Sequence, residues 1–116
     1  MEINLIIILS IILIHFFGDF IIQTDWQAKN KSSNLEALLN HTTTYTLCWL
    51  PFCLYYHLGY FMIITWFFHT ITDYLTSRWV KKSFEKQDYH MGFVKIGLDQ
   101  CGHYIQLFLT FYFLTN

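Results

Sequence analysis

The chain has 116 residues, of which 54% are hydrophobic, 21% are aromatic and only 13% are charged. An average soluble domain carries about 25% charged residues, so this composition favours a protein that is surrounded by lipid. The net charge of −1 excludes the strongly basic surface of a nucleic-acid-binding protein. Because the length suits one domain and the chain has a single proline and five glycines, we expect one transmembrane domain over residues 1–116.

Four apolar segments define the predicted elements, in chain order 3–22, 35–56, 60–80 and 93–114. At about 1.5 Å per residue, a helix of roughly 20 residues covers the ~30 Å hydrocarbon core of a bilayer. The first segment follows Glu2 and lacks a cleavage site of small residues, so we expect it to stay in the mature protein. Pro51 is expected to kink or break the second segment locally. The predicted fold is all-α, an integral membrane four-helix bundle.

The positive charges predict the orientation of this bundle. Every lysine and arginine lies in or beside the two long connections, residues 23–34 and 81–92: Lys29, Lys31, Arg78, Lys81, Lys82, Lys86 and Lys95. Loops rich in these residues face the cytoplasm. With four spans, both connections lie on the same side. Both termini are therefore predicted on the non-cytoplasmic side of the inner cell membrane.

Histidines and aspartates recur inside the apolar segments at a spacing of four residues, which places both members of a pair on one helix face. The first segment carries His15 and Asp19, the third His69 and Asp73, and the fourth the reversed pair Asp99 and His103. The second segment adds His41 near its start. From the helical rise, all seven groups are predicted in one slab roughly 5–17 Å from the cytoplasmic edge.

A buried metal ion would explain this slab. Each carboxylate inside a bilayer costs about 2.5–3.5 kcal/mol on insertion scales, and no lysine or arginine is expected within the slab to offset that cost. Imidazole and carboxylate ligands suit zinc best, with manganese or iron as alternatives. Seven ligand groups exceed the needs of one tetrahedral ion, so one or two ions are expected. The predicted ligands are His15, Asp19, His41, His69, Asp73, Asp99 and His103.

Further roles follow from position along the chain. An aspartate that does not bind metal would serve as general base, with Asp19, Asp73 and Asp99 as candidates. Gln100 follows Asp99 and is expected to orient a ligand. A predicted substrate rim at the cytoplasmic mouth, with a solvated loop as the alternative interpretation, comprises Gln23, Asp25, Trp26 and Lys29.

These motifs resemble a known family over nearly the whole chain. The residues that carry the resemblance are His15, Asp19, Gln23, Asp25, Trp26, Gln27, Lys29, His41, His69, Asp73, Tyr74, Asp99, Gln100 and His103. The sequence resembles the short bacterial and phage polytopic membrane proteins grouped as domain of unknown function 3307. A looser similarity, limited to histidine- and aspartate-bearing membrane helices, links it to membrane-bound metal-dependent hydrolases.

Three function classes fit these observations. The leading hypothesis is a metal-dependent hydrolase acting on a lipid-like or amphipathic substrate, with membrane lipid and a divalent metal as partners. The second is a proton or metal-ion transporter or relay, a homo-oligomer because four helices enclose little volume. The third is a phage-type membrane interaction protein in which the polar groups only hold helices together.

Overall fold

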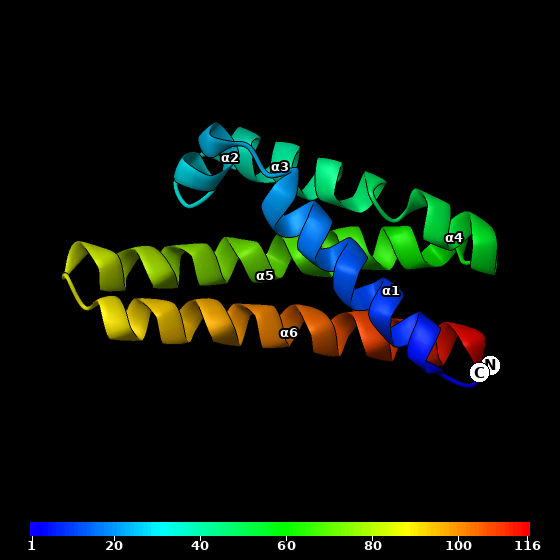
Figure 1. Cartoon of the computed structure of the whole chain (residues 1–116). Coiled ribbons are helices and arrows are strands. Elements are labelled where there is room, and N and C mark those ends of the chain that lie inside the picture. The colour runs from blue at the N-terminus through cyan, green and yellow to red at the C-terminus, as the bar shows by residue number, and fades with distance from the viewer.

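The computed structural model describes residues 1–116 and contains only helices (Figure 1). This confirms the predicted all-α class. In chain order the elements are α1 (Leu5–Phe16), the π-helix η1 (Phe17–Ile21), α2 (Asp25–Asn30), α3 (Leu35–Leu47), α4 (Leu50–Tyr56), α5 (Gly59–Glu85) and α6 (Tyr89–Thr115).

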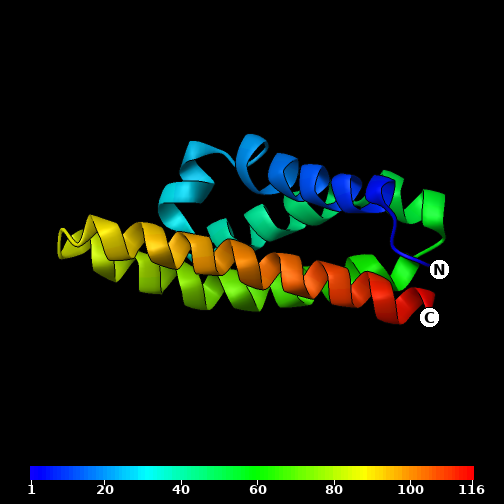
Figure 2. The ribbon, with the colours of Figure 1, turned by 60° about the horizontal axis from the view of Figure 1, so that its bottom comes forward.

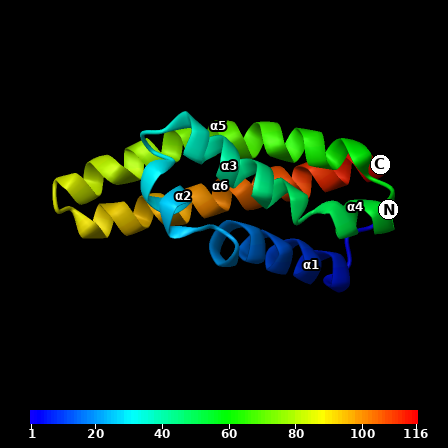
Figure 3. The same ribbon diagram turned by 90° about the horizontal axis from the view of Figure 1, so that it is seen from above.

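The helices form two layers within dimensions of 46 × 27 × 20 Å. The long helices α5 and α6 run antiparallel as one layer, and α1, α3 and α4 lie over them (Figures 1 and 2). Seen from above, α2 lies between the end of η1 and the start of α3 (Figure 3). The termini meet at one end of the molecule, where the Met1 ammonium donates to the Thr115 carbonyl at 2.8 Å.

The first apolar segment is helical from Leu5 to Ile21, and its winding changes from α-helical to π-helical at Phe17. Asn4 caps α1 by accepting from the Ile7 amide at 3.0 Å. The Ile22 amide then reaches the Phe17 carbonyl, five residues back, at 2.9 Å, which is the π-helical pattern. This wide turn buries Gly18 and Asp19. The sequence carries no signal for it.

The second segment is divided in two, as a proline nearby would suggest. α3 ends at Leu47 and α4 begins at Leu50, with Pro51 in its first turn. Proline is tolerated there because the first helical amides have no partner inside the helix. The segment therefore breaks just before Pro51, in agreement with the expected local kink or break.

The two polar connections are more helical than predicted. Residues 23–34 contain α2, which starts with a capping box in which Thr24 and Gln27 bond each other's backbone amides. Their spacing is the sequence signature of such a box. The second connection shrinks to residues 86–88, because α5 continues to Glu85 and α6 begins directly after Asp88. Gln87 makes this tight turn with a φ of 60°.

Apolar side chains occupy both the core and much of the surface. Near the termini, ten buried residues form the core: Ile7, Ile11, Tyr45, Trp49, Phe52, Cys53, Leu58, Phe61, Leu107 and Phe111. Many large apolar side chains of α1, α5 and α6 face outward, among them Leu5 (67% exposed), Ile63 (65%) and Phe113 (71%). No helix combines the length and the apolar character of a membrane-crossing helix. The predicted membrane spans and inner-membrane location thus gain no support from the individual helices.

Candidate metal centre

Two histidines and two aspartates converge in the buried centre between the layers. Asp19 comes from η1, His41 from α3, and His69 and Asp73 from successive turns of α5. All four side chains are at most 4% exposed. His41 Nε2 lies 3.0 Å from Asp19 Oδ1 and 3.2 Å from Asp73 Oδ2, and His69 Nε2 lies 3.4 Å from each of these oxygens. Four ligand atoms therefore face one point.

Five of the six distances between these atoms lie near the edge length of a coordination tetrahedron. Zinc bonds of about 2.0–2.1 Å to nitrogen and oxygen place tetrahedral corners about 3.3–3.4 Å apart. The four His–Asp edges measure 3.0–3.4 Å, and the two Nε2 atoms of His41 and His69 are also 3.4 Å apart. A neutral imidazole has a single N–H, so hydrogen bonds alone do not satisfy all these contacts. The four side chains can hold a metal ion.

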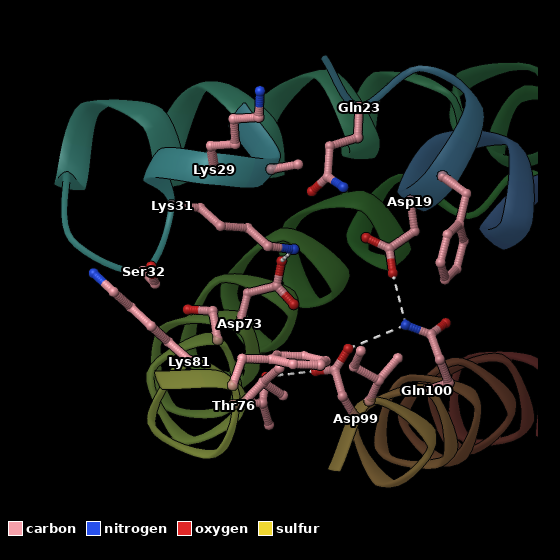
Figure 4. Close-up of a pocket in the computed structure, with 16 residues that line it drawn as sticks. Asp19, Gln23, Lys29, Lys31, Ser32, Asp73, Thr76, Lys81, Asp99 and Gln100 are labelled. Carbon is pink, nitrogen blue, oxygen red and sulfur yellow. Dashed lines mark hydrogen bonds and ion pairs between the residues drawn. The ribbon is translucent and has the colours of Figure 1, made fainter. Parts of the chain in front are cut away.

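Lys31 brings a positive charge to this cluster. The expectation that no lysine lies among these groups is wrong, because Lys31 Nζ lies 3.2 Å from Asp73 Oδ2 and the side chain is only 18% exposed. Helix α2 folds the connection back over the centre, and Lys31 points inward from its end (Figure 4). Burial alone would lower the pKa of Lys31, but the carboxylates of Asp73 and Asp19 outweigh burial and raise it.

The formal charges still leave room for a cation. The carboxylates of Asp19, Asp73 and Asp99 sum to three negative charges, and the Lys31 ammonium cancels one. When the histidines are neutral, as metal coordination requires, two negative charges remain, which one divalent ion balances. A proton on His103, which lies between Asp73 and Asp99, would cancel one of these charges.

Asp99 and His103 of α6 extend the cluster. His103 Nε2 lies 3.0 Å from Asp73 Oδ1 and 3.1 Å from Asp99 Oδ1. Asp19, Asp99 and His103 form a second group of close ligand atoms. Here Asp99 Oδ1 also accepts from the Thr76 hydroxyl at 2.5 Å. The group of Asp19, His41, His69 and Asp73 is the better candidate for a metal because it offers four ligand atoms from buried side chains, whereas the second group offers three and its Asp99 is 12% exposed.

His15 lies behind the cluster, outside both groups of ligand atoms. Its Nδ1 is 2.8 Å from the Tyr45 hydroxyl and its Nε2 is 2.7 Å from Gln100 Oε1. The Gln100 amide nitrogen donates to Asp19 Oδ2 at 3.0 Å and to Asp99 Oδ2 at 3.1 Å. His15 therefore fixes the orientation of Gln100, which in turn holds two carboxylates. Such outer hydrogen bonds tune the geometry of metal ligands.

Tyr45 is a supporting residue that the sequence reasoning missed. Its ring stacks on His69 at 3.8 Å between centroids and 12° between planes, and His103 stacks on His69 at 4.1 Å. The Nδ1 atoms of His41 and His69 have no hydrogen-bond partner, so ring packing orients His69. Tyr45 follows His41 by four residues, and this helical spacing is the signal that could have found it.

A cleft leads from the surface to the carboxylates (Figure 4). It has a volume of about 410 Å³, and Asp19, Asp73, Asp99 and Gln100 lie among its lining residues. Gln23 and Lys29 of the predicted rim also line it, whereas Asp25 and Trp26 are exposed residues of α2 outside the lining. The sequence reasoning did not identify the remaining polar lining residues: Lys31, Ser32, Thr76, Ser77 and Lys81.

The molecule is a helical protein whose buried histidine–aspartate cluster can hold a metal ion and opens to the surface through a partly basic cleft. The chain belongs to the family described as protein of unknown function (DUF3307), whose model matches residues 7–116. This confirms the resemblance at the level of the family. No curated protein and no solved structure matches the chain, so the looser similarity to membrane-bound hydrolases gains no support from these comparisons.

Proposed function

We propose that this protein is a metal-dependent hydrolase that sits in the membrane and acts on a lipid-like or amphipathic ester. The observation that carries the proposal is the tetrahedral spacing of Asp19, His41, His69 and Asp73 next to an open cleft. Zinc fits this set best, and manganese or iron would also accept these ligands. Four protein ligands alone complete a tetrahedral zinc site, so an ion held by these residues would supply Lewis acidity only if it accepted a substrate oxygen as an additional ligand.

Asp99 is the strongest candidate for the general base in this scheme. It lines the cleft, it is 12% exposed, and it lies outside the four-ligand group. Asp99 would take one proton from water while the water oxygen bonds to the carbonyl carbon or phosphorus of the ester. The bond to the alcohol oxygen breaks, and the alcohol leaves with the proton that Asp99 took up from water. Thr76 and Gln100 hold the Asp99 carboxylate in place through hydrogen bonds.

The surface supports the membrane part of the proposal. Large apolar side chains face outward along α1, α5 and α6, and monomeric soluble proteins rarely expose large contiguous apolar patches. Lys81, Lys82, Glu85 and Lys86 gather at the turn between α5 and α6, at the end of the molecule away from the termini. The molecule is 46 Å long, so this charged end would extend beyond a hydrocarbon core of about 30 Å.

The distribution of titratable groups along the molecule favours hydrolysis over transport. The end of the molecule that carries the termini is filled by an apolar core that includes Trp49, Phe61 and Phe111. A proton or ion relay would need titratable groups to continue through this region.

Elemental analysis of the purified protein tests the metal site. We expect about one zinc, manganese or iron per chain, lost in His69→Ala and in the milder His69→Gln, and kept in His90→Ala. His90 is an exposed histidine in the first turn of α6 and serves as the matched control. A folded wild-type chain without metal, whose melting temperature does not rise when metal is added, would overturn the proposal.

Two further measurements test catalysis and location. Metal-loaded protein in neutral detergent should hydrolyse members of a panel of long-chain carboxylic and phosphate esters. Asp99→Asn should abolish that activity while the metal content stays, and Glu36→Gln, an exposed carboxylate at the start of α3, should leave it unchanged. Cell membranes washed with alkaline carbonate should retain the protein, and its release into the wash would refute membrane insertion.

A further inference from the structure

We propose that the cleft above the metal centre binds the phosphate group of an anionic amphiphile, that is, a phosphate ester with an apolar chain. This inference rests on the proposed function and names its substrate class. It comes from the polar side chains along the cleft, from two buried polar atoms without partners, and from the apolar walls (Figure 4).

One face of α5 forms a polar ladder from the floor of the cleft to its mouth. Asp73, Ser77 and Lys81 follow one another at intervals of four residues, and all three line the cleft. Four residues of helix rise about 6 Å, so the ladder spans about 12 Å. A carboxylate lies at its base, a hydroxyl in the middle and an ammonium at the top. An anion that enters the cleft therefore meets positive charge first and a hydrogen-bond donor next.

Two buried polar atoms in the cleft lack hydrogen-bond partners. They are Ser77 Oγ and Gln23 Oε1, and such atoms are rare in folded proteins. The Gln23 amide points toward the space between Lys31 and Asp19 (Figure 4). The Ser77 hydroxyl can donate to a phosphate oxygen, and Gln23 can donate through its amide nitrogen once the amide group rotates by about 180°.

The cations around the cleft differ in what they do. Lys29 and Lys81 direct their ammonium groups outward at the mouth (Figure 4), where they would attract an anion. The ion pair of Lys81 with Glu85 is 3.9 Å long and both side chains are exposed, so it competes little. Lys31 points inward to Asp73. It would form a charge-assisted hydrogen bond with a phosphate held at Ser77.

The walls favour an amphiphile over inorganic phosphate. Apolar side chains from three elements line the cleft: Phe20 from η1, Val80 and Phe84 from α5, and Ile96 from α6. The volume of about 410 Å³ lies within the range of about 300–1,000 Å³ that is typical of sites for small organic ligands. An alkyl chain attached to the phosphate would cover these side chains.

Calorimetric titration of metal-loaded protein in neutral detergent tests this inference. The probes are octyl phosphate, inorganic phosphate and octyltrimethylammonium, used after excess metal has been removed. We expect saturable binding of octyl phosphate, at least about tenfold tighter than that of the other two probes. Lys31→Met should weaken it on the order of tenfold and Ser77→Ala should also weaken it, whereas Lys82→Met, a lysine outside the cleft lining, should not.

Lys31→Met gives a second, opposite readout. Loss of a positive charge 3.2 Å from Asp73 should tighten metal binding, or at least not weaken it, while phosphate binding falls. A variant that was merely misfolded would lose both.

The outcomes separate the two proposals. Equal binding of inorganic phosphate would overturn the amphiphile, and equal binding of octyltrimethylammonium or an unaffected Lys31→Met would overturn the phosphate site. Metal-loaded protein that binds no octyl phosphate refutes this inference and leaves the metal-dependent function standing. If the protein holds no metal but binds octyl phosphate through Lys31, the phosphate site stands and the proposed function fails.

Discussion

Substitution of Gly18 by alanine should disturb the candidate metal centre without touching any ligand. A Cβ atom at Gly18 would lie 2.9 Å from Tyr45 Cδ2 and 3.4 Å from the Tyr45 carbonyl oxygen. Tyr45 is fully buried, its ring stacks on His69, and its hydroxyl contacts His15. The ring has no free space to move into, so the steric overlap must shift the stack that orients His69.

The expected cost is that of overpacking a core, about 1–3 kcal/mol. For a chain of this size, 1 kcal/mol corresponds to roughly 4 °C in Tm, so Gly18→Ala should melt about 4–12 °C below the wild type. Gly97→Ala is the matched control in α6, because no atom lies within 4 Å of a Cβ at that position. Alanine is the better helix former, and Gly97→Ala should gain about 0.5–1 kcal/mol.

Thermal unfolding of the two variants in one detergent measures this difference, and elemental analysis of the same samples reports the metal. We expect Gly18→Ala to hold less metal than Gly97→Ala. Equal melting temperatures for the two variants would refute the close approach of η1 to Tyr45, and with it the view that this contact orients His69.

Four further expectations concern the cluster and the core. Removal of bound metal with a chelator should lower the free energy of unfolding by about 2.7 kcal/mol, compared with protein at a free metal concentration of 100 Kd. An unchanged Tm would show that the folded state does not bind the ion. Tyr45→Phe removes the hydroxyl that is 2.8 Å from His15 Nδ1 and should cost about 1–3 kcal/mol with the metal content unchanged, whereas loss of metal would assign the hydroxyl a larger role. Gln100→Leu removes contacts with His15, Asp19 and Asp99 and should weaken metal binding about 10–100-fold. The control is Gln106→Leu, which should leave metal binding unchanged because Gln106 contacts Thr65 and Thr110 instead. Phe111→Ala should cost about 3–5 kcal/mol because the ring is fully buried, and Phe113→Ala, 71% exposed, should cost almost nothing; similar melting temperatures would contradict the placement of the core.

Several elements of the structure could be predicted because they depend on local pattern. Helices α1, α5 and α6 follow apolar runs, and residues four apart share a face, so the pairs His15–Asp19, His69–Asp73 and Asp99–His103 come out within 3.7 Å. The Thr24–Gln27 capping box and the position of Pro51 also carry local signals for α2 and α4. The family resemblance likewise needed only these motifs.

The closest contacts of the cluster depend on how the helices pack against one another. The contacts of His41 with Asp19 and of His103 with Asp73 join residues of different helices, and each measures 3.0 Å. The pair His15–Asp19 lies within one continuous helical segment and is 3.7 Å apart. Both ring nitrogens of His15 contact other side chains, Nδ1 the Tyr45 hydroxyl and Nε2 the Gln100 amide oxygen. No periodicity in the chain predicts which faces of different helices meet.

The sequence by itself determined the helical class, the family and the set of histidines and aspartates, because composition and a four-residue spacing are properties of the chain. Only the tertiary structure decided which of them share a site. The π-helical turn at Phe17–Ile21 buries Asp19 against α3 and α5, and α2 folds Lys31 inward onto Asp73. Both effects come from packing between residues distant in sequence. The same packing brings Asp19, His41, His69 and Asp73 together as one group of four ligand atoms.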